Sequence, residues 1–234
     1  MFLAESRAIR KSLRKCLAKN PKRLYIHGLG QTPAVWHPVL RLLNTSADCA
    51  EPDLASLVCN QPATYANLYS AFARLCDESE AKLALCGLSL GGVLALHYAV
   101  EHPERVGALV LIAPQYKMPK RLLQIQNALF HLMPASMFGE TGFSKAQFIQ
   151  LCGSMTNLDF TAALPRISCP TLVICGSRDH ANKKACTQLA QLVRGAEFAM
   201  ITGAGHELNR EAPQPLANLL QSFYTKAVTD DLHD

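Results

Sequence analysis

The chain has 234 residues, of which 49% are hydrophobic and 18% charged, a size that suits one globular domain with a single core. It contains neither 18 consecutive apolar residues nor the apolar region of a secretory signal, which argues against a membrane span or export and favours a cytoplasmic protein. The net charge of +5 arises from residues 1–23, where eight Lys or Arg accompany a single acid, so the remaining chain is nearly neutral and is not expected to bind nucleic acid.

The first predicted element is a basic amphipathic helix in residues 1–22. We expect this helix to pack on the core with its Lys and Arg side chains in water. Contact of residues 1–20 with a membrane surface and a role as a transit peptide are alternatives that the pattern favours less. The apolar side chains that lie near helical spacing, with cations between them, are Leu3, Ile9, Leu13 and Leu17.

From residue 23 onward, short apolar runs that end in turns alternate with segments of helical length. The runs are continuous rather than alternating in polarity, which is typical of strands that are covered on both faces. This pattern predicts an α/β fold with a mostly parallel sheet of about six strands and helices on both faces. The predicted strands are Leu24–Ile26, Ala47–Glu51, Leu83–Cys86, Ala108–Ala113, Thr171–Cys175 and Phe198–Ile201, and the clearest helices are Ala63–Cys76, Gly91–His102 and Lys183–Val193.

Residues 115–165 interrupt this rhythm, because they contain helical patterns but no run typical of a strand. We expect two or three helices that form a short cap over the carboxyl edge of the sheet, where open α/β sheets bind ligands. The predicted organisation is therefore an N-terminal helix in residues 1–22, a core in residues 23–114 and 166–226, and a cap in residues 115–165.

The strongest chemical motif is G-x-S-x-G at Gly87–Gly91, directly after an apolar strand and before an apolar helix. A serine at such a turn has a strained backbone that lifts its hydroxyl above the sheet, so Ser89 is the predicted nucleophile. The backbone N–H of Leu90 would lie at the helix N-terminus and would stabilise developing negative charge. The alternative is a serine that only caps the helix.

A serine hydroxyl needs a base, and the base needs a carboxylate. His206 follows the last predicted strand and is the predicted base, whereas Asp179 follows the preceding strand and is the predicted acid. The order Ser…Asp…His along the chain fits this arrangement. For Asp179 the alternative is a cap for the helix that begins near Asn182. Other histidines and acids could in principle serve as base or acid, but we expect them to be packing, turn or surface residues. They are Asp53, His97, His102, His131, Asp159 and His180.

The second donor to an oxyanion should come from the loop His27–Gly30, because its glycines allow backbone amides to turn inward. The N–H of Leu29 is the candidate, and His27 is expected to shape the turn by hydrogen bonding. The nine cysteines are odd in number and contain no C-x-x-C pair, which predicts reduced thiols. Neither a metal site nor a nucleotide cofactor is predicted, because metal-ligand spacing and a phosphate-binding loop are both missing from the sequence.

Taken together, these motifs resemble those of the α/β-hydrolase superfamily, particularly its small esterase-like members. The resemblance implies a carboxylic ester or thioester hydrolase with an acyl-serine intermediate and a small-molecule substrate. Family members commonly begin with a β-hairpin, which the basic segment replaces here. The resemblance rests on His27–Gly30 with Trp36 downstream, Pro52–Leu54, Gly87–Gly92, Pro170–Val173 leading to Asp179, and Gly205-His206.

The cap contributes apolar residues that could contact an acyl group, so the predicted substrate-binding residues are Leu29, Leu90, Phe130 and Met133. Other chemistry on the same residues stays open, namely hydrolysis of a C–C bond, a lyase step or amide cleavage. A non-catalytic ligand receptor and a membrane-recruited lipase are further alternatives. The oligomeric state is not predicted.

Overall fold

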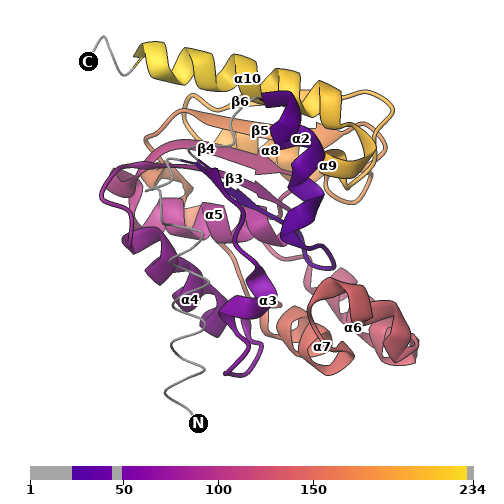
Figure 1. Cartoon of the computed structure of the whole chain (residues 1–234). Coiled ribbons are helices and arrows are strands. Elements are labelled where there is room, and N and C mark those ends of the chain that lie inside the picture. The colour runs from indigo at the N-terminus through magenta and orange to yellow at the C-terminus, as the bar shows by residue number, and fades with distance from the viewer. Residues whose placement is uncertain (1–22, 44–48, 231–234) are drawn as a thin grey trace.

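The computed structural model describes residues 23–43 and 49–230 (Figure 1). The predicted N-terminal helix lies outside the described residues, as does the start of the predicted strand Ala47–Glu51. Within the described part of the chain, no helix is both long and apolar enough to cross a membrane.

Six parallel strands form one sheet, which confirms the predicted fold class. The strand order is β2-β1-β3-β4-β5-β6, so the chain builds the sheet outward from β1 in two directions. The central strands are buried along nearly their whole length, which explains why their sequences are continuously apolar. The strands are β1 (Arg23–Ile26), β2 (Cys49–Ala50), β3 (Leu83–Leu88), β4 (Val106–Ile112), β5 (Thr171–Gly176) and β6 (Glu197–Ile201).

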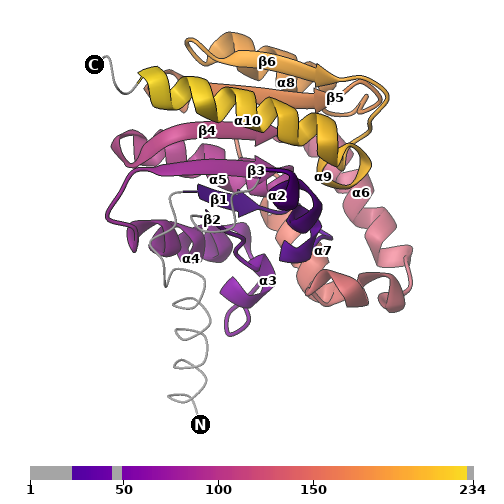
Figure 2. The ribbon, with the colours of Figure 1, turned by 45° about the horizontal axis from the view of Figure 1, so that its top comes forward.

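Helices cover both faces of this sheet (Figures 1 and 2). The α-helices are α2 (His37–Leu43), α3 (Leu54–Leu57), α4 (Tyr65–Asp77), α5 (Leu90–Glu101), α6 (Lys120–Leu132), α7 (Lys145–Ser154), α8 (Lys183–Leu192), α9 (Leu208–Glu211) and α10 (Pro213–Asp230). The 3-10 helices are η1 (Pro33–Trp36), η2 (Pro103–Arg105), η3 (Ala135–Thr141) and η4 (Thr161–Arg166).

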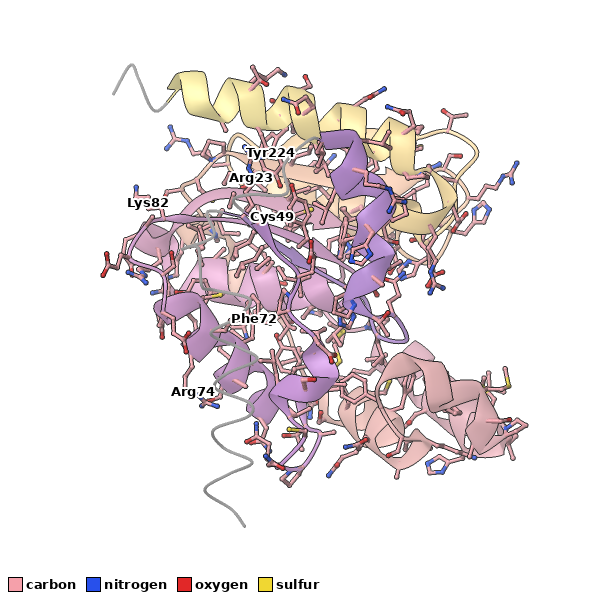
Figure 3. The ribbon with its side chains drawn as sticks, in the orientation of Figure 1. Arg23, Cys49, Phe72, Arg74, Lys82 and Tyr224 are labelled. Carbon is pink, nitrogen blue, oxygen red and sulfur yellow. The ribbon has the colours of Figure 1, made fainter. Side chains whose placement is uncertain are left out.

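Two hydrophobic clusters result, because alternate strand residues point to opposite faces. Side chains of α4, α5 and α8 pack on one face, and side chains of α2 and α10 pack on the other. Figure 3 shows Phe72 of α4 and Tyr224 of α10 on these two sides of the sheet. The guanidinium of Arg23 lies 4.6 Å from the ring centre of Tyr224 and joins the start of β1 to α10.

Helix α5 directly follows the serine turn and lies across the middle of the sheet. Its sequence has no charged residue before Glu101, and ten of its twelve residues are buried. An all-round apolar helix is expected where no face meets water. The helix ends where His102 precedes Pro103, since a residue before proline disfavours helical backbone.

The predicted cap contains α6, η3, α7 and η4, which connect β4 to β5 (Figure 1). Helix α7 begins with a capping box in which Ser144 and Gln147 exchange hydrogen bonds. The rings of Phe130, Phe138 and Phe148 meet edge to face, with centroids 4.9 to 6.1 Å apart. These aromatic contacts join α6 and η3 to α7, and they continue the hydrophobic cluster on one face of the sheet.

Candidate active site

Ser89 lies at a tight turn between β3 and α5. Its φ of 53° and ψ of −114° place a non-glycine residue in a strained backbone region, as the motif predicts. The Ser89 N–H donates to the carbonyl of Ile112 at 2.8 Å, and the Ser89 carbonyl accepts from Val93 at 2.9 Å. Neighbouring β4 and the first turn of α5 therefore hold the strained residue in place.

Glycines make this turn possible because neighbouring backbone fills the space of a side chain. A Cβ atom on Gly87 would lie 2.2 Å from the Gly91 carbonyl oxygen. A Cβ atom on Gly91 would lie 2.2 Å from the carbonyl oxygen of Ile26, at the end of β1. Helix α5 consequently begins in contact with the end of β1, where the loop to Leu29 starts.

Two backbone amides are available to bind an oxyanion at this point. Within the described residues, neither the N–H of Leu29 nor that of Leu90 donates a hydrogen bond. Leu90 is the first residue of α5, where backbone N–H groups have no partner inside the helix. Both leucines line the same cavity as Ser89. This arrangement supports the predicted oxyanion donors, and their role stays a proposal.

His27 shapes the loop that carries Leu29, as predicted. Its Nδ1–H donates to the Gly28 carbonyl at 2.9 Å, and its Nε2 accepts from the Leu54 N–H at 3.2 Å. Burial lowers the pKa of this fully buried imidazole, which favours the neutral form that both hydrogen bonds require. His27 is therefore a structural link between the loop and α3.

His206 and Asp179 form a hydrogen-bonded pair, with 2.8 Å between Nδ1 of His206 and Oδ2 of Asp179. Burial tends to raise the pKa of Asp179, but hydrogen bonds from His206 and Asn182 outweigh burial and leave this pKa below its ordinary value. The two loops approach closely at Gly176, where a Cβ atom would lie 2.1 Å from the carbonyl oxygen of Gly205. Asp179 also accepts from the N–H of Asn182 at 3.3 Å. Asn182 is itself the N-cap residue of α8 and this helix has no side-chain cap, so Asp179 supports the turn before the helix rather than capping it.

A cavity of about 410 Å³ brings the predicted residues together. Among the hydrogen bonds of the described residues, none joins Ser89 to His206. The side chain of His206 is 39% exposed, and that of Asp179 is 4% exposed, so the imidazole lies between the buried acid and the open cavity. The lining residues are Leu29, Ser89, Leu90, Val93, Ala113, Gln115, Met118, Pro119, Leu123, Phe148, Cys152, Met155, Asp179, Ala181, Asn182 and His206.

Phe130 and Met133 are not among the residues that line this cavity. Phe130 packs edge to face against Phe148, whose ring does line it, and Met133 packs against the hydrophobic core. The cap contacts the cavity instead through Met118, Pro119, Leu123, Phe148, Cys152 and Met155. Phe130 therefore lies behind Phe148 rather than on the cavity wall, and Met133 contacts the core without lining the cavity.

Buried amides around the site were missed by the sequence reasoning. Gln31 and Asn209 exchange two hydrogen bonds of 3.2 Å, and Gln31 also accepts from the N–H of Gly28 at 3.1 Å. These contacts connect the Leu29 loop to α9, just after His206. Asn182 and Gln115 were missed in the same way. One indication of a role for Asn182 was available in the sequence, namely that it is a polar residue three positions after the predicted acid, Asp179.

The rival residues have structural partners of their own. Asp53 caps α3, and Asp159 forms an ion pair with Lys117 at 2.9 Å. His97 stacks on Tyr69 with ring centroids 3.6 Å apart. In the described ranges, no group of three His, Cys, Asp or Glu residues could hold a metal ion. Among the described residues, the free thiols include Cys59, Cys76, Cys86, Cys152, Cys169, Cys175 and Cys186.

Comparisons with known proteins identify relatives of this chain. RutD of Escherichia coli, whose name describes a carbamate hydrolase, is 24% identical over 242 residues that cover 87% of this chain and 91% of RutD. A pimeloyl-[acyl-carrier protein] methyl ester esterase of Aliivibrio salmonicida is 29% identical over 106 residues, 44% of this chain and 41% of that protein. The polyketide synthase ThaQ of Burkholderia thailandensis is 27% identical over 80% of this chain, which spans 11% of that much longer protein.

Solved structures show the same fold at lower identity. The enol-lactonase from Burkholderia xenovorans LB400 has a TM-score of 0.73 and 21% identity, with 88% of this chain and 91% of that chain covered. MenH from S. aureus has a TM-score of 0.75 and 14% identity, with 89% and 95% covered. The model of the alpha/beta hydrolase family matches residues 24–219. Because this match spans most of the sequence and the six-stranded sheet has the same fold, the chain belongs to the alpha/beta hydrolase family.

Proposed function

We propose that this protein is a serine hydrolase that cleaves a small carboxylic ester, or a thioester, through an acyl-serine intermediate. The observation that carries the proposal is the convergence of Ser89, the Asp179–His206 pair and two free backbone amides on one cavity. Nucleophile, base, acid and oxyanion donors are the complete set that acyl transfer requires. Relatives named as an esterase and as a carbamate hydrolase support hydrolysis at an acyl group.

In the proposed reaction, Nε2 of His206 takes the hydroxyl proton of Ser89 while Oγ attacks the ester carbonyl carbon. The electron pair of the carbonyl moves to its oxygen, which the amides of Leu29 and Leu90 stabilise. Collapse of this intermediate breaks the bond to the alcohol, which takes the proton from His206. Water then attacks the acyl-serine while His206 accepts its proton. The bond between the acyl carbon and Oγ breaks, His206 returns the proton to Oγ, and the carboxylic acid leaves as Ser89 is restored.

The cavity lining favours an uncharged, apolar substrate. Apart from Asp179 and His206, the described residues that line the cavity include no acid and no Lys or Arg. A substrate carboxylate would lack a counter-charge there, and burial of an unpaired charge is costly. The volume of about 410 Å³ is in the lower part of the range for small-molecule sites. These features favour a short or medium acyl chain.

A panel of p-nitrophenyl substrates tests the proposed function. We expect kcat/KM for the butyrate ester to exceed that for the hemisuccinate ester at least about tenfold, because an unpaired carboxylate costs more than 1.4 kcal/mol. We also expect the butyrate ester to react faster than the matching anilide. A β-diketone preferred over every ester would favour C–C bond hydrolysis, and preferred cleavage of the anilide would favour an amidase. Binding of these compounds without turnover would favour a ligand receptor and contradict the proposal.

A further inference from the structure

Asn182 makes the closest polar contacts to the acid of the site apart from His206. It is the residue directly before α8, three positions after Asp179. Its side-chain Nδ2 lies 2.9 Å from Oδ1 and 3.0 Å from Oδ2 of Asp179, and its backbone N–H donates to Oδ1 at 3.3 Å. One asparagine therefore supplies both a side-chain and a backbone donor to this nearly buried carboxylate.

The orientation of the Asn182 amide is fixed from the cap. Its Oδ1 accepts from Nε2 of Gln115 at 2.7 Å, and the same nitrogen of Gln115 lies 3.4 Å from the carbonyl oxygen of Ala181. Because Oδ1 faces this donor, the NH2 group of Asn182 faces Asp179. Gln115 is the first residue of the cap segment and also lines the substrate cavity.

Asn182 and His206 share the same carboxylate. Nδ2 of Asn182 lies 3.1 Å from Nδ1 of His206, and both nitrogens are within 3.0 Å of Oδ2 of Asp179. Since the proton on Nδ1 is donated to Asp179, these two nitrogens are neighbouring donors rather than partners. Asn182 thus holds the carboxylate plane and absorbs part of its charge. The charge of Asp179 also opposes ionisation of the thiols of Cys175 and Cys186, and Lys183 favours ionisation of Cys175.

We propose that Asn182 is a positioning residue for the Asp179–His206 pair, and that Gln115 holds it in the productive orientation. The inference rests on the proposed function, because it assigns a role in that same reaction. Through the chain Gln115–Asn182–Asp179–His206, a residue that borders the substrate cavity is connected to the catalytic base by three successive contacts. The contact of Gln115 with Asn182, which joins the cap to the start of α8, is thereby coupled to the orientation of His206.

Two substitutions of similar size separate this role from simple packing. N182D replaces a donor by a carboxylate beside Asp179, so the added negative charge favours protonated His206. A protonated imidazole cannot accept the serine proton. We therefore expect the acid limb of the kcat/KM profile to move to higher pH by about one unit or more. N182L removes the donor without adding charge, and its kcat should fall roughly 10-fold or more with little change in KM.

The test measures kcat and KM for p-nitrophenyl butyrate from pH 5 to 9 in the wild type, N182D, N182L and Q115L. Q115L should lower kcat in the same direction as N182L, with a smaller effect, because Asn182 keeps its donors but loses its fixed orientation. N218D makes the same charge change on exposed Asn218 of α10, and its profile should match the wild type. Thermal unfolding of each variant shows which ones are folded, and if N182D fails to fold, N182L and Q115L decide the question.

Two failures can be told apart with the S89A variant. If S89A retains the wild-type rate, the proposed function itself is wrong. If S89A is inactive while folded N182D and N182L retain the wild-type profile and kcat, the proposed function stands and the positioning role is wrong. A loss in N182L that appears in KM alone would also contradict the proposal, since it would indicate a substrate contact rather than orientation of the base.

Discussion

Replacement of Ser89 by alanine should lower kcat for an ester substrate by roughly 10⁴- to 10⁶-fold, the range found when a triad serine or its partners are removed from serine hydrolases. The reason is that alanine has no hydroxyl, so the proposed nucleophile that forms the acyl intermediate beside His206 is lost. The measurement is the rate of p-nitrophenol release by wild type and S89A at equal concentration. Because the Ser89 side chain borders the cavity and the strained backbone is unchanged, the variant should unfold near the wild-type temperature.

The exposed serine Ser70 provides the matched control. Its hydroxyl accepts a hydrogen bond from Arg74 on the surface of α4, far along the chain from the turn at Ser89. S70A should retain kcat within about twofold, as expected for a surface substitution. Equal rates for S89A and S70A would contradict the assignment of the nucleophile.

Replacement of Asp179 by asparagine should lower kcat about 10⁴-fold with only a small change in size. The carboxylate accepts the Nδ1–H of His206 at 2.8 Å and so leaves Nε2 free to accept the serine proton. An asparagine can present its NH2 group to Nδ1, which favours the tautomer with the proton on Nε2. It also removes the charge that stabilises the imidazolium. Steady-state kinetics at the pH optimum measure the effect.

The control for this substitution is D159N. Asp159 has an exposed ion pair with Lys117 and caps the turn at Thr161, so it resembles Asp179 in being a hydrogen-bonded acid outside a strand. An exposed ion pair contributes little to stability, and D159N should retain kcat within about twofold. A large loss in D159N together with a small loss in D179N would reverse the assignment of the acid.

The fold, and the placement of Ser89, Asp179 and His206 around one cavity, could be predicted because local sequence determines them. A continuous apolar run reports a strand covered on both faces, and parallel strands bring their carboxyl ends to one edge of the sheet. Ser89, Asp179 and His206 each follow such a run within a few residues. The close approaches at Gly91 and Gly176 explain why glycine occurs beside each of these turns.

The cap residues that line the cavity could not be predicted from local pattern. Phe130 and Leu123 are seven residues apart on α6, which is about two helical turns, so both belong to the same apolar stripe. Which part of the stripe meets the cavity depends on how the cap sits on the core. Here Leu123 lines the cavity and Phe130 packs on Phe148 behind it.

The buried amide contacts were also beyond the reach of local pattern. Gln31 and Asn209 are 178 positions apart in the sequence, and each is polar in a segment that otherwise gives no indication of burial. Asn182 is closer to its partner, but its role depends on Gln115, which comes from the other side of the cap insertion. Such contacts appear when distant loops meet, and a sequence read one segment at a time does not reveal them.

Mass spectrometry after covalent labelling tests the central claim most directly. The protein is treated with an active-site-directed fluorophosphonate, digested, and its peptides are weighed and fragmented. We expect one phosphonyl group per chain on the peptide that contains Ser89, with much less labelling in D179N and none in S89A. Ester turnover by a chain that carries the label on another residue, or on no residue at all, would contradict the assignment of Ser89 as the nucleophile.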